Sequence, residues 1–192
     1  MSTKRLIVGI SGASGAVYGI RLLEVLREVE EVETHLVVSS AAKLTISLET
    51  DYSFEAVEAL ADRVYRPGDI AAPISSGSFK TMGMVVAPCS MKTVSGIAHS
   101  YTDNLLLRAA DVVLKDRRRL VLVPRETPLH LGHLRLLTQV TEMGAIVMPP
   151  TPAFYHRPQK IEEIVDQTVN RVLDLLEIEL NGDLFERWQG PQ

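Results

Sequence analysis

Small hydroxyl residues and glycines follow several apolar runs of this sequence, and they are the first residues that suggest chemistry. Gly9, Gly12 and Gly15 are spaced three apart around one turn, while Ser39 and Ser90 each follow a further apolar run directly. Glycine lets the backbone approach a ligand closely, and the N-terminus of a following helix offers free N–H groups to an anion. The pattern indicates a pocket for an oxygen-rich ligand that carries a phosphate.

Each of these features also has a plainer explanation when it is taken alone. The glycine turn can be an ordinary connection from strand to helix, and each serine can simply cap the helix that follows it. The sequence contains neither the G-x-G-x-x-G dinucleotide motif nor a Walker A motif nor a G-x-S-x-G elbow. Taken together, the strand ends fit an uncharged ring system with a phosphate attached, which describes FMN better than ATP.

Charged residues at the next strand end and near the last helix are candidates for holding that phosphate. Arg125 and Glu126 follow the apolar run LVLVP, and an arginine there can clamp a phosphate or pair with a flavin carbonyl. Arg171 borders the apolar stripe of the last predicted helix, and Tyr155 lies in the loop before it. The alternatives are a surface ion pair for Arg125 and Glu126, and packing of the aliphatic stem for Arg171.

Composition argues against several other classes of protein. The formal net charge of −4 disfavours a binder of nucleic acid or of anionic membranes. Cys89 is the only cysteine, so no intramolecular disulfide forms and the cytoplasm is the expected compartment. No apolar run approaches the roughly 18 residues of a membrane span. His130 and His133 are three apart but have no convincing third ligand, so no metal site is expected.

Strands alternating with helices must position these residues. Residues 5–10, 34–39, 84–87, 120–123 and 145–148 read as buried strands. Helices are predicted from about 14, over 41–49 and 54–63, from about 90, and over 105–115, 133–143 and 161–176, with a loop over 66–80. This alternation predicts a single α/β domain over 1–192, a Rossmann-like, three-layer, doubly wound parallel sheet. The helix and tail of about 160–192 are expected to pack on the core or on a neighbouring subunit.

Seven segments, in order along the chain, resemble one family. They are GISGASGA, SLETD, SSGSF, PCSMKT, RAADVVLK, LVPRETPLH and PAFYHRPQ. Each motif alone is modest, but seven in register between about Arg5 and Trp188 are specific. Together they resemble the flavin prenyltransferases of the UbiX type, long described as aromatic-acid decarboxylases.

The resemblance implies an activity and an assembly. It implies transfer of a dimethylallyl group from dimethylallyl phosphate to N5 and C6 of reduced FMN, without a metal. The product, prenylated FMN, would serve a separate UbiD-type decarboxylase in ubiquinone biosynthesis or on aromatic acids. The resemblance further implies a homo-oligomer, a dodecamer, with FMN bound between subunits.

The resemblance also assigns roles to residues of the matching motifs. The implied FMN contacts are Gly12, Ala13, Ser14, Ser39, Ser90, Met91, Lys92, Thr93 and Arg125. The implied contacts to dimethylallyl phosphate are Tyr155 and Arg171, with Lys115 and Arg108 nearby and Arg108 also able to come from a neighbouring subunit. The implied proton carriers are Glu49 and Glu126, assisted by Ser14, and Trp188 would help to close the pocket.

The implied chemistry requires these residue types. Phosphate leaves readily only when its charge is neutralised, which Lys115, Arg171 and the Tyr155 hydroxyl can do. Alkylation at C6 releases a proton, and Glu49 is the candidate base. Glu126 would protonate the departing phosphate or act as a relay, and the sequence leaves these two glutamate roles open.

Two other functions remain as alternatives. One is a flavin-dependent decarboxylase of the related cysteine decarboxylase family, which would not need the phosphate cluster. The other is a non-catalytic FMN-binding subunit that supports a partner decarboxylase. The sequence also leaves open whether the prenyl donor is a monophosphate or a diphosphate.

Overall fold

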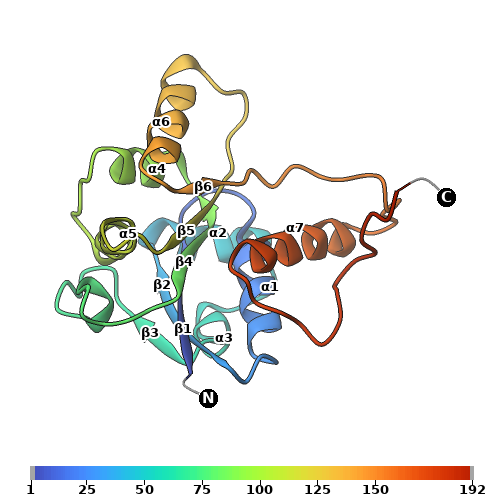
Figure 1. Ribbon diagram of the computed structural model, residues 1–192, viewed down its shortest axis with the longest axis horizontal. Helices are drawn as coiled ribbons and strands as arrows, with labels where there is room; N and C mark the ends of the chain where they lie inside the picture. Colours follow the sequence, from blue (N-terminus) through green and yellow to red (C-terminus); the bar gives the residue numbers. More distant parts are fainter. Residues whose placement is uncertain (1–2, 191–192) are drawn as a thin grey trace.

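The computed structural model describes residues 3–190 and contains one parallel sheet (Figure 1). The strands are β1 (Lys4–Ile10), β2 (Val32–Val38), β3 (Arg63–Tyr65), β4 (Gly83–Cys89), β5 (Arg119–Pro124) and β6 (Ile146–Val147). Their order across the sheet is β3-β2-β1-β4-β5-β6, and every neighbouring pair is parallel. The predicted doubly wound α/β fold is confirmed.

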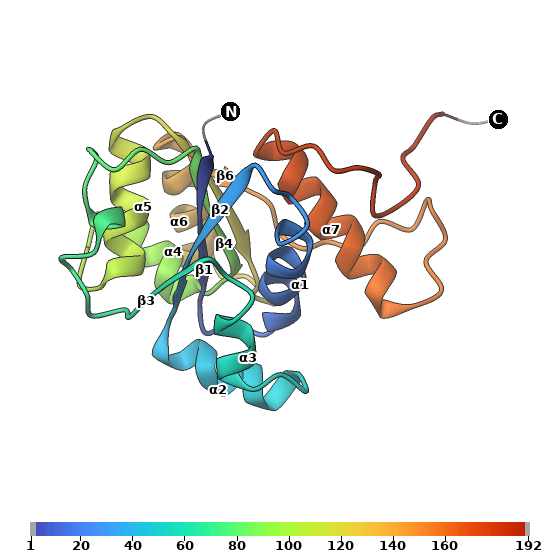
Figure 2. The same cartoon turned by 90° about the horizontal axis from the view of Figure 1, so that it is seen from below.

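Helices cover both faces of this sheet. They are α1 (Ala16–Leu26), α2 (Ser40–Glu49), α3 (Phe54–Glu58), α4 (Met91–Ala98), α5 (Leu105–Lys115), α6 (Leu131–Glu142) and α7 (Ile161–Leu175), with a short 3₁₀ turn at Pro73–Ser75. Figure 2 shows α1 and α7 on one face and α4, α5 and α6 on the other. The sequence prediction was wrong in one stretch: the helix expected over 54–63 ends at Glu58, and β3 follows it. Two of the three residues of β3 are exposed, so this edge strand lacks an apolar run.

Alternating side chains of the buried strands build two cores. Val8 and Ile10 of β1 point into the core beneath α1 and α7, while Ile7 joins the core beneath α5. In β4, Val85 packs on the first side and Val86 on the second. Because both faces of these strands are covered, β4 is buried along its whole length and β1 from Leu6 onward, as is typical of parallel sheets.

Strands β1 and β4 lie side by side at the centre, where the chain winds away in opposite directions. The connection through α1 returns to β2, whereas the connection through α4 and α5 leads to β5. Ligands of such sheets bind beyond the carboxyl ends of the strands at this switch point. Here the buried Ser11 hydroxyl donates to the carbonyl of Pro88 (3.0 Å) and accepts from the N–H of Ser90 (2.8 Å). These bonds fix the two strand ends that frame the crevice.

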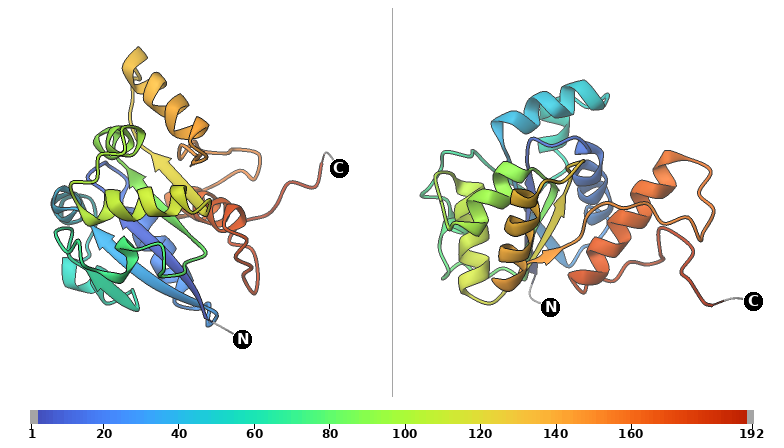
Figure 3. Two further views of the ribbon diagram at one scale, coloured as in Figure 1. Left: turned by 60° about the vertical axis from the view of Figure 1, so that its left-hand side comes forward. Right: turned by 90° about the horizontal axis from the view of Figure 1, so that it is seen from above.

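Helix α7 packs against α1, and the chain then continues as a C-terminal tail, residues 176–190. The guanidinium of Arg21 on α1 contacts the carboxylate of Asp166 on α7 at 2.6 Å. Figure 3 shows the tail and the proline-rich loop before α7 reaching away from the sheet. Among the helices of residues 3–190, none has the length and apolar character needed to cross a bilayer.

Candidate functional site

A cavity of about 280 Å³ opens at the carboxyl edge of the sheet. It is lined by Gly12, Ser39, Ser40, Ala41, Pro67, Ser90, Lys92, Thr93, Asn104, Leu106 and Leu107. The turns after β1, β2 and β4 all contribute to it, as the sequence predicted for the strand ends. The lining includes several of the expected FMN contacts, namely Gly12, Ser39, Ser90, Lys92 and Thr93.

The glycines of the first turn are required by close packing. A side chain at Gly12 would place its Cβ 2.4 Å from the Cβ of Ala41 on α2. Gly15 has a φ of +101°, in the left-handed region that disfavours residues with a side chain. The turn therefore packs directly against α2, and at Gly12 the cavity is lined by backbone and not by a side chain.

The N-terminus of α4 faces this cavity and is suited to an anion. The hydroxyl of Ser90 accepts from the N–H of Thr93 (3.3 Å) and lies 3.0 Å from the Thr93 hydroxyl. The N–H groups of Met91 and Lys92, in the first turn, have no acceptor within the helix. These groups, the helix dipole and the Lys92 ammonium attract negative charge here.

The N-terminus of α1 is occupied by a carboxylate of the protein. Glu49, at the end of α2, accepts from the N–H groups of Gly15 (2.7 Å) and Ala16 (3.2 Å). Burial raises the pKa of Glu49, but hydrogen bonds from Ser14, Gly15 and Ala16 and the charge of Arg125 outweigh it and lower the pKa. Glu49 is therefore ionised at neutral pH, as a general base must be.

Arg125 and Glu126 follow β5 and are both exposed. The N–H of Arg125 donates to the carbonyl of Cys89 at the end of β4 (3.1 Å), and Glu126 accepts from the N–H of Thr127 (3.0 Å). Since the charge of Arg125 acts on Glu49, the structure brings Glu49 and Arg125 to the same edge of the sheet. Neither of these residues nor Glu126 lines the 280 Å³ cavity, and Glu49 lines a separate pocket together with residues of α1 and α7.

Of the residues predicted to bind dimethylallyl phosphate, Arg171 lies on α7 and Tyr155 lies in the loop before it, where it meets Trp188 of the tail. The rings of Tyr155 and Trp188 meet edge to face, with centroids 5.7 Å apart. Arg171 donates to Asp174 at 2.7 Å, and 47% of its side chain is exposed. Arg171 therefore faces solvent rather than bordering the apolar stripe, because that stripe is buried against α1. None of the three lines the 280 Å³ cavity.

Lys115 lies at the opposite edge of the sheet from the cavity. Helix α5 begins beside the cavity, where its capping residue Asn104 lies, and it runs antiparallel to the strands. Its last residue, Lys115, contacts Asp116 (2.9 Å) and lies beside Gly77, in the loop before β4. The seven residues of β4 span roughly 20 Å between the two edges. Lys115 therefore cannot reach the cavity of its own protomer.

Arg108, one turn into α5, is held away from the cavity as well. Its guanidinium donates to the carbonyl of Ser75 (3.2 Å) and to the carboxylate of Asp111 (2.9 Å). These partners fix it over the 3₁₀ turn on the outer side of α5. Within one protomer, the structure does not bring Arg108 and Lys115 to Tyr155 and Arg171.

Three polar residues at the crevice, namely Ser11, Ser40 and Asn104, were not among the predicted site residues. Ser11 joins the ends of β1 and β4, and its position directly after an apolar run was the same signal that identified Ser39 and Ser90. Asn104 lines the cavity and caps α5 by accepting from the N–H of Leu107 (3.1 Å). Nothing in the sequence marks Asn104 beyond its capping position.

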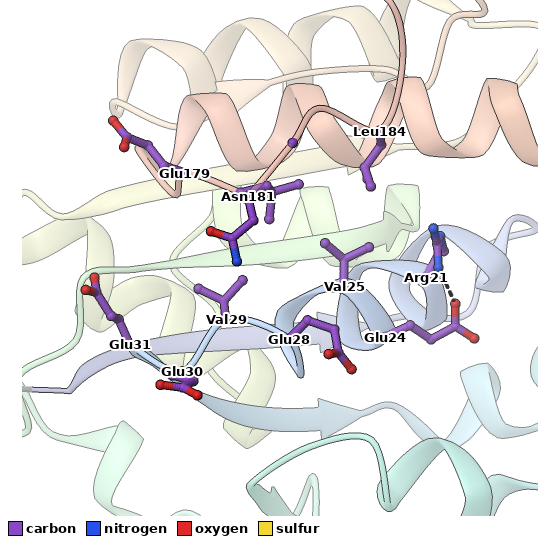
Figure 4. Close-up of a pocket in the computed structure, with 12 residues that line it drawn as sticks. Arg21, Glu24, Val25, Glu28, Val29, Glu30, Glu31, Glu179, Asn181 and Leu184 are labelled. Carbon is purple, nitrogen blue, oxygen red and sulfur yellow. Dashed lines mark hydrogen bonds and ion pairs between the residues drawn. The ribbon is translucent and has the colours of Figure 1, made fainter.

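A second groove, of about 590 Å³, is unsuited to a phosphate ligand. It lies between α1 and the start of the tail (Figure 4). The lining carboxylates are Glu24, Glu28, Glu30, Glu31 and Glu179, and Arg21 is the one basic residue that lines it. Within residues 3–190, no group of three or more His, Cys, Asp or Glu side chains is arranged to hold a metal ion.

Known proteins resemble this chain over nearly its full length. A family model described as Flavoprotein matches residues 1–173. The flavin prenyltransferase UbiX of Escherichia coli K12 is 69% identical over 187 residues, which cover 97% of this chain and 99% of that protein. The flavin prenyltransferase UbiX of Thauera aromatica is 58% identical over 188 residues, which cover 98% and 95%.

Solved structures agree with these relatives. The crystal structure of AnUbiX (PadA1) in complex with FMN and dimethylallyl pyrophosphate matches with a TM-score of 0.94 and 51% identity, over 99% of this chain and all of that one. A dodecameric FMN-dependent UbiX-like decarboxylase from Escherichia coli O157:H7 matches with a TM-score of 0.93 and 54% identity, over 97% and 100%.

Proposed function

We infer that this chain, which belongs to the Flavoprotein family and to its UbiX-type flavin prenyltransferases, transfers a dimethylallyl group to N5 and C6 of reduced FMN. The product is prenylated FMN. The observation that carries this conclusion is the cavity formed by the strand-end turns, in a chain 69% identical to a flavin prenyltransferase over 97% of its length. Reduced FMN supplies the two nucleophilic positions, and the protein supplies binding, charge and proton transfer.

In this proposal the strand-end turns hold FMN. Gly12 and Ala13 let the ring system approach the backbone, since the turn at Gly12 has no room for a side chain. Ser39, Ser90 and the first turn of α4 bind the polar chain and phosphate. Met91, Lys92 and Thr93 contribute through that turn, and Arg125 pairs with the flavin from the end of β5. The open donors of the α4 N-terminus support this placement.

Glu49 is proposed as the base that removes the C6 proton. Its carboxylate is kept ionised by Ser14 and by the N–H groups at the start of α1, in spite of its partial burial. The same contacts fix the direction in which the carboxylate points. Glu126, which follows Arg125 at the end of β5, is proposed to protonate the departing phosphate.

The remaining charge for phosphate departure is proposed to come from more than one copy of the chain. This chain forms a homododecamer, like its structural relative. Arg171 lies on α7 and Tyr155 in the loop before it, while Lys115 and Arg108 lie on α5. Because Lys115 is across the sheet from its own cavity, it completes the site of a neighbouring copy. In this arrangement residues 1–192 act as one flavoprotein domain, with α7 and the tail reaching toward neighbours.

The wider setting is part of the same proposal. Prenylated FMN is a cofactor for another enzyme, and a UbiD-type decarboxylase is the proposed recipient. The cytoplasm is the proposed compartment, because the reaction consumes reduced flavin and the one cysteine, Cys89, is a buried free thiol.

Mass spectrometry of the flavin tests the activity directly. The protein is incubated anaerobically with reduced FMN and either dimethylallyl phosphate or dimethylallyl pyrophosphate, and the released flavin is weighed. We expect the flavin mass to increase by one prenyl group, and the rates with the two donors show which one the enzyme prefers. Unchanged flavin with both donors would contradict the proposal. In that case, release of CO₂ from a peptidyl cysteine would identify a decarboxylase, and tight FMN binding alone would identify a non-catalytic subunit.

A further inference from the structure

Asp174, on the last turns of α7, is the centre of a network that includes Arg171 but has itself no role in the proposed reaction. One carboxylate oxygen, Oδ2, accepts from Nη1 of Arg171 (2.7 Å) and from Nη1 of Arg187 (3.0 Å). The other, Oδ1, accepts from Nη2 of Arg187 (2.8 Å) and from the amide of Asn170 (3.4 Å). Asp174 therefore joins α7 to the tail and orients Arg171 at the same time.

Arg171 retains donors for a ligand after this contact is made. Asp174 takes one N–H of its Nη1, and its Nε and Nη2 groups have no hydrogen-bond partner within residues 3–190. With 47% of the side chain exposed, the guanidinium can present two parallel N–H groups to a phosphate. The Asp174 contact selects one orientation of a flexible side chain without consuming its binding edge.

Arg187 fixes the tail to the same carboxylate. Its guanidinium binds both oxygens of Asp174 and also contacts Asp183 at 2.5 Å. One turn earlier on α7, the buried Asn170 accepts from the backbone N–H of Leu184 (2.8 Å). The tail is thereby held at side chain and backbone, and the residue after Arg187 is Trp188.

Trp188 lies against Tyr155 at the end of this network. The two rings meet edge to face, and His156 beside Tyr155 contacts Phe185 of the tail in the same way (5.7 Å). The proline-rich loop and the tail are thus joined by aromatic contacts, while α7 and the tail are joined by ionic ones. The aromatic contacts include Tyr155 and the ionic contacts include Arg171, the two residues assigned to the prenyl phosphate.

We propose that Asp174 is a positioning residue for prenyl phosphate binding, which orients Arg171 and, through Arg187, keeps Trp188 beside Tyr155. This inference rests on the proposed role of Arg171. The carboxylates of Asp174 and Asp183 balance the guanidiniums of Arg171 and Arg187, so the network itself carries no net charge. The positive charge of Arg187 offsets the negative charge of Asp174, so Asp174 can orient Arg171 without a net repulsion of the bound phosphate.

Asp174→Asn tests the inference, because it keeps the side-chain shape and removes the charge. We expect KM for dimethylallyl phosphate to rise roughly tenfold, as for the loss of one charge-assisted contact, with kcat changed less and FMN affinity within about twofold. Asp174→Glu should recover most of the loss. An unchanged or lower KM in Asp174→Asn would overturn the inference, since Asp174 would then be inert or a competitor of the phosphate.

The tail gives a readout that does not depend on turnover. Trp188 is the only tryptophan in the sequence, so its fluorescence anisotropy in the enzyme loaded with oxidised FMN reports the mobility of the tail. We expect lower anisotropy in both Asp174→Asn and Arg187→Ala than in the unmodified protein. On addition of dimethylallyl phosphate or inorganic phosphate, the anisotropy of Asp174→Asn should change less than that of the unmodified protein. Anisotropy equal to the unmodified protein in both variants would overturn the coupling to the tail.

Two further variants separate this inference from the assignment of Arg171. Asp166→Asn makes the same substitution on the same helix but removes a contact with Arg21 of α1, and it should leave KM and anisotropy unchanged. Arg171→Ala should raise KM, and combining it with Asp174→Asn should add nothing. A normal KM in Arg171→Ala refutes the role of Arg171 itself. A raised KM there with a normal KM in Asp174→Asn refutes only the positioning role.

Discussion

In the proposed site, a single protomer supplies the whole flavin side but only part of the phosphate side. The flavin side consists of the turns after β1, β2 and β4, joined by the buried Ser11 and formed largely by backbone. The phosphate side consists of exposed side chains on α7, the tail and the far end of α5. Its members in one protomer lie in at least two separate places.

The two ligands make different demands on the fold. A ring that must be held flat in a narrow cleft is best bound by rigid turns between packed elements, which the sheet provides within each copy. A phosphate that must be bound and then released is better served by charged side chains that come together only in the assembled oligomer. Assembly, in this view, is part of forming the phosphate site.

The largest effect is expected on the flavin side. Glu49→Gln keeps the size of the side chain and its contact with the start of α1, but it cannot accept the C6 proton. We expect prenylated flavin to form about 10²- to 10⁴-fold more slowly, with FMN affinity nearly unchanged. Stopped-time mass spectrometry of the flavin measures the rate.

The matched control for Glu49→Gln is Asp51→Asn, which neutralises an exposed carboxylate two residues along the chain and should leave the rate unchanged. Normal turnover in Glu49→Gln would remove this residue from the mechanism. Loss of FMN together with turnover would show that it serves binding instead.

The next effect addresses the separation of Lys115 from its own cavity. Lys115→Ala and Glu49→Gln should each be nearly inactive alone. If Lys115 serves a neighbouring copy, oligomers reassembled from an equal mixture contain some sites with both residues intact, and activity should recover to roughly a quarter of normal. Recovery would not occur if both residues act within one protomer. Mixing each variant with itself through the same cycle provides the control.

A smaller effect is expected from Ser11→Ala. Removing this buried hydroxyl leaves the N–H of Ser90 without its acceptor, while the carbonyl of Pro88 still accepts from the backbone N–H of residue 11, and the loss should cost about 1–3 kcal/mol of stability. Because these groups frame the cavity, we also expect FMN to bind several-fold more weakly, whereas KM for dimethylallyl phosphate should change little. Thermal unfolding and flavin titration measure the two effects. An equal rise in both constants would argue against two separable sides.

The positions of the flavin-side turns could be predicted from the sequence because they follow from local patterns. The apolar runs located the strands, and residues directly after them, such as Ser39 and Ser90, must meet at one edge of a parallel sheet. The edge strand β3 was missed, since three partly exposed residues carry no apolar signal. The bounds of α5, Leu105–Lys115, were predicted correctly.

The phosphate side could not be reached in the same way. The direction in which α5 crosses the sheet places Lys115 opposite the cavity, and this follows from topology rather than from local pattern. Glu49, although it belongs to the flavin side, was also identified by family resemblance alone, because its contact with Gly15 joins residues 34 positions apart. Likewise, the link from Arg187 to Asp174 depends on how the tail folds back onto α7.

The smallest effect is that of mild acid, which should leave both sides intact. The pKa of Glu49 is lowered below its ordinary 4.5 as described above, and hydrogen bonds from Arg187 lower the pKa of Asp174 below its ordinary 3.8. A carboxylate with a lowered pKa keeps its contacts until the pH falls to that lower value. Between pH 7 and pH 5, neither side should therefore lose its charge.

The stability that is lost in this pH range should come instead from His35, which lies at the β2–β3 edge away from both sides. Burial lowers the pKa of His35 from its ordinary 6.5, so the folded protein keeps the ring neutral while the unfolded chain takes up a proton. The free energy of unfolding should then fall with falling pH below about 6.5, by at most about 1.4 kcal/mol per pH unit. His35→Phe keeps an aromatic ring between Tyr65 and Phe79 and should flatten this slope. If the free energy of unfolding of His35→Phe still fell with pH as in the unmodified protein, and FMN bound more weakly at pH 5, the acid sensitivity would belong to the flavin side instead.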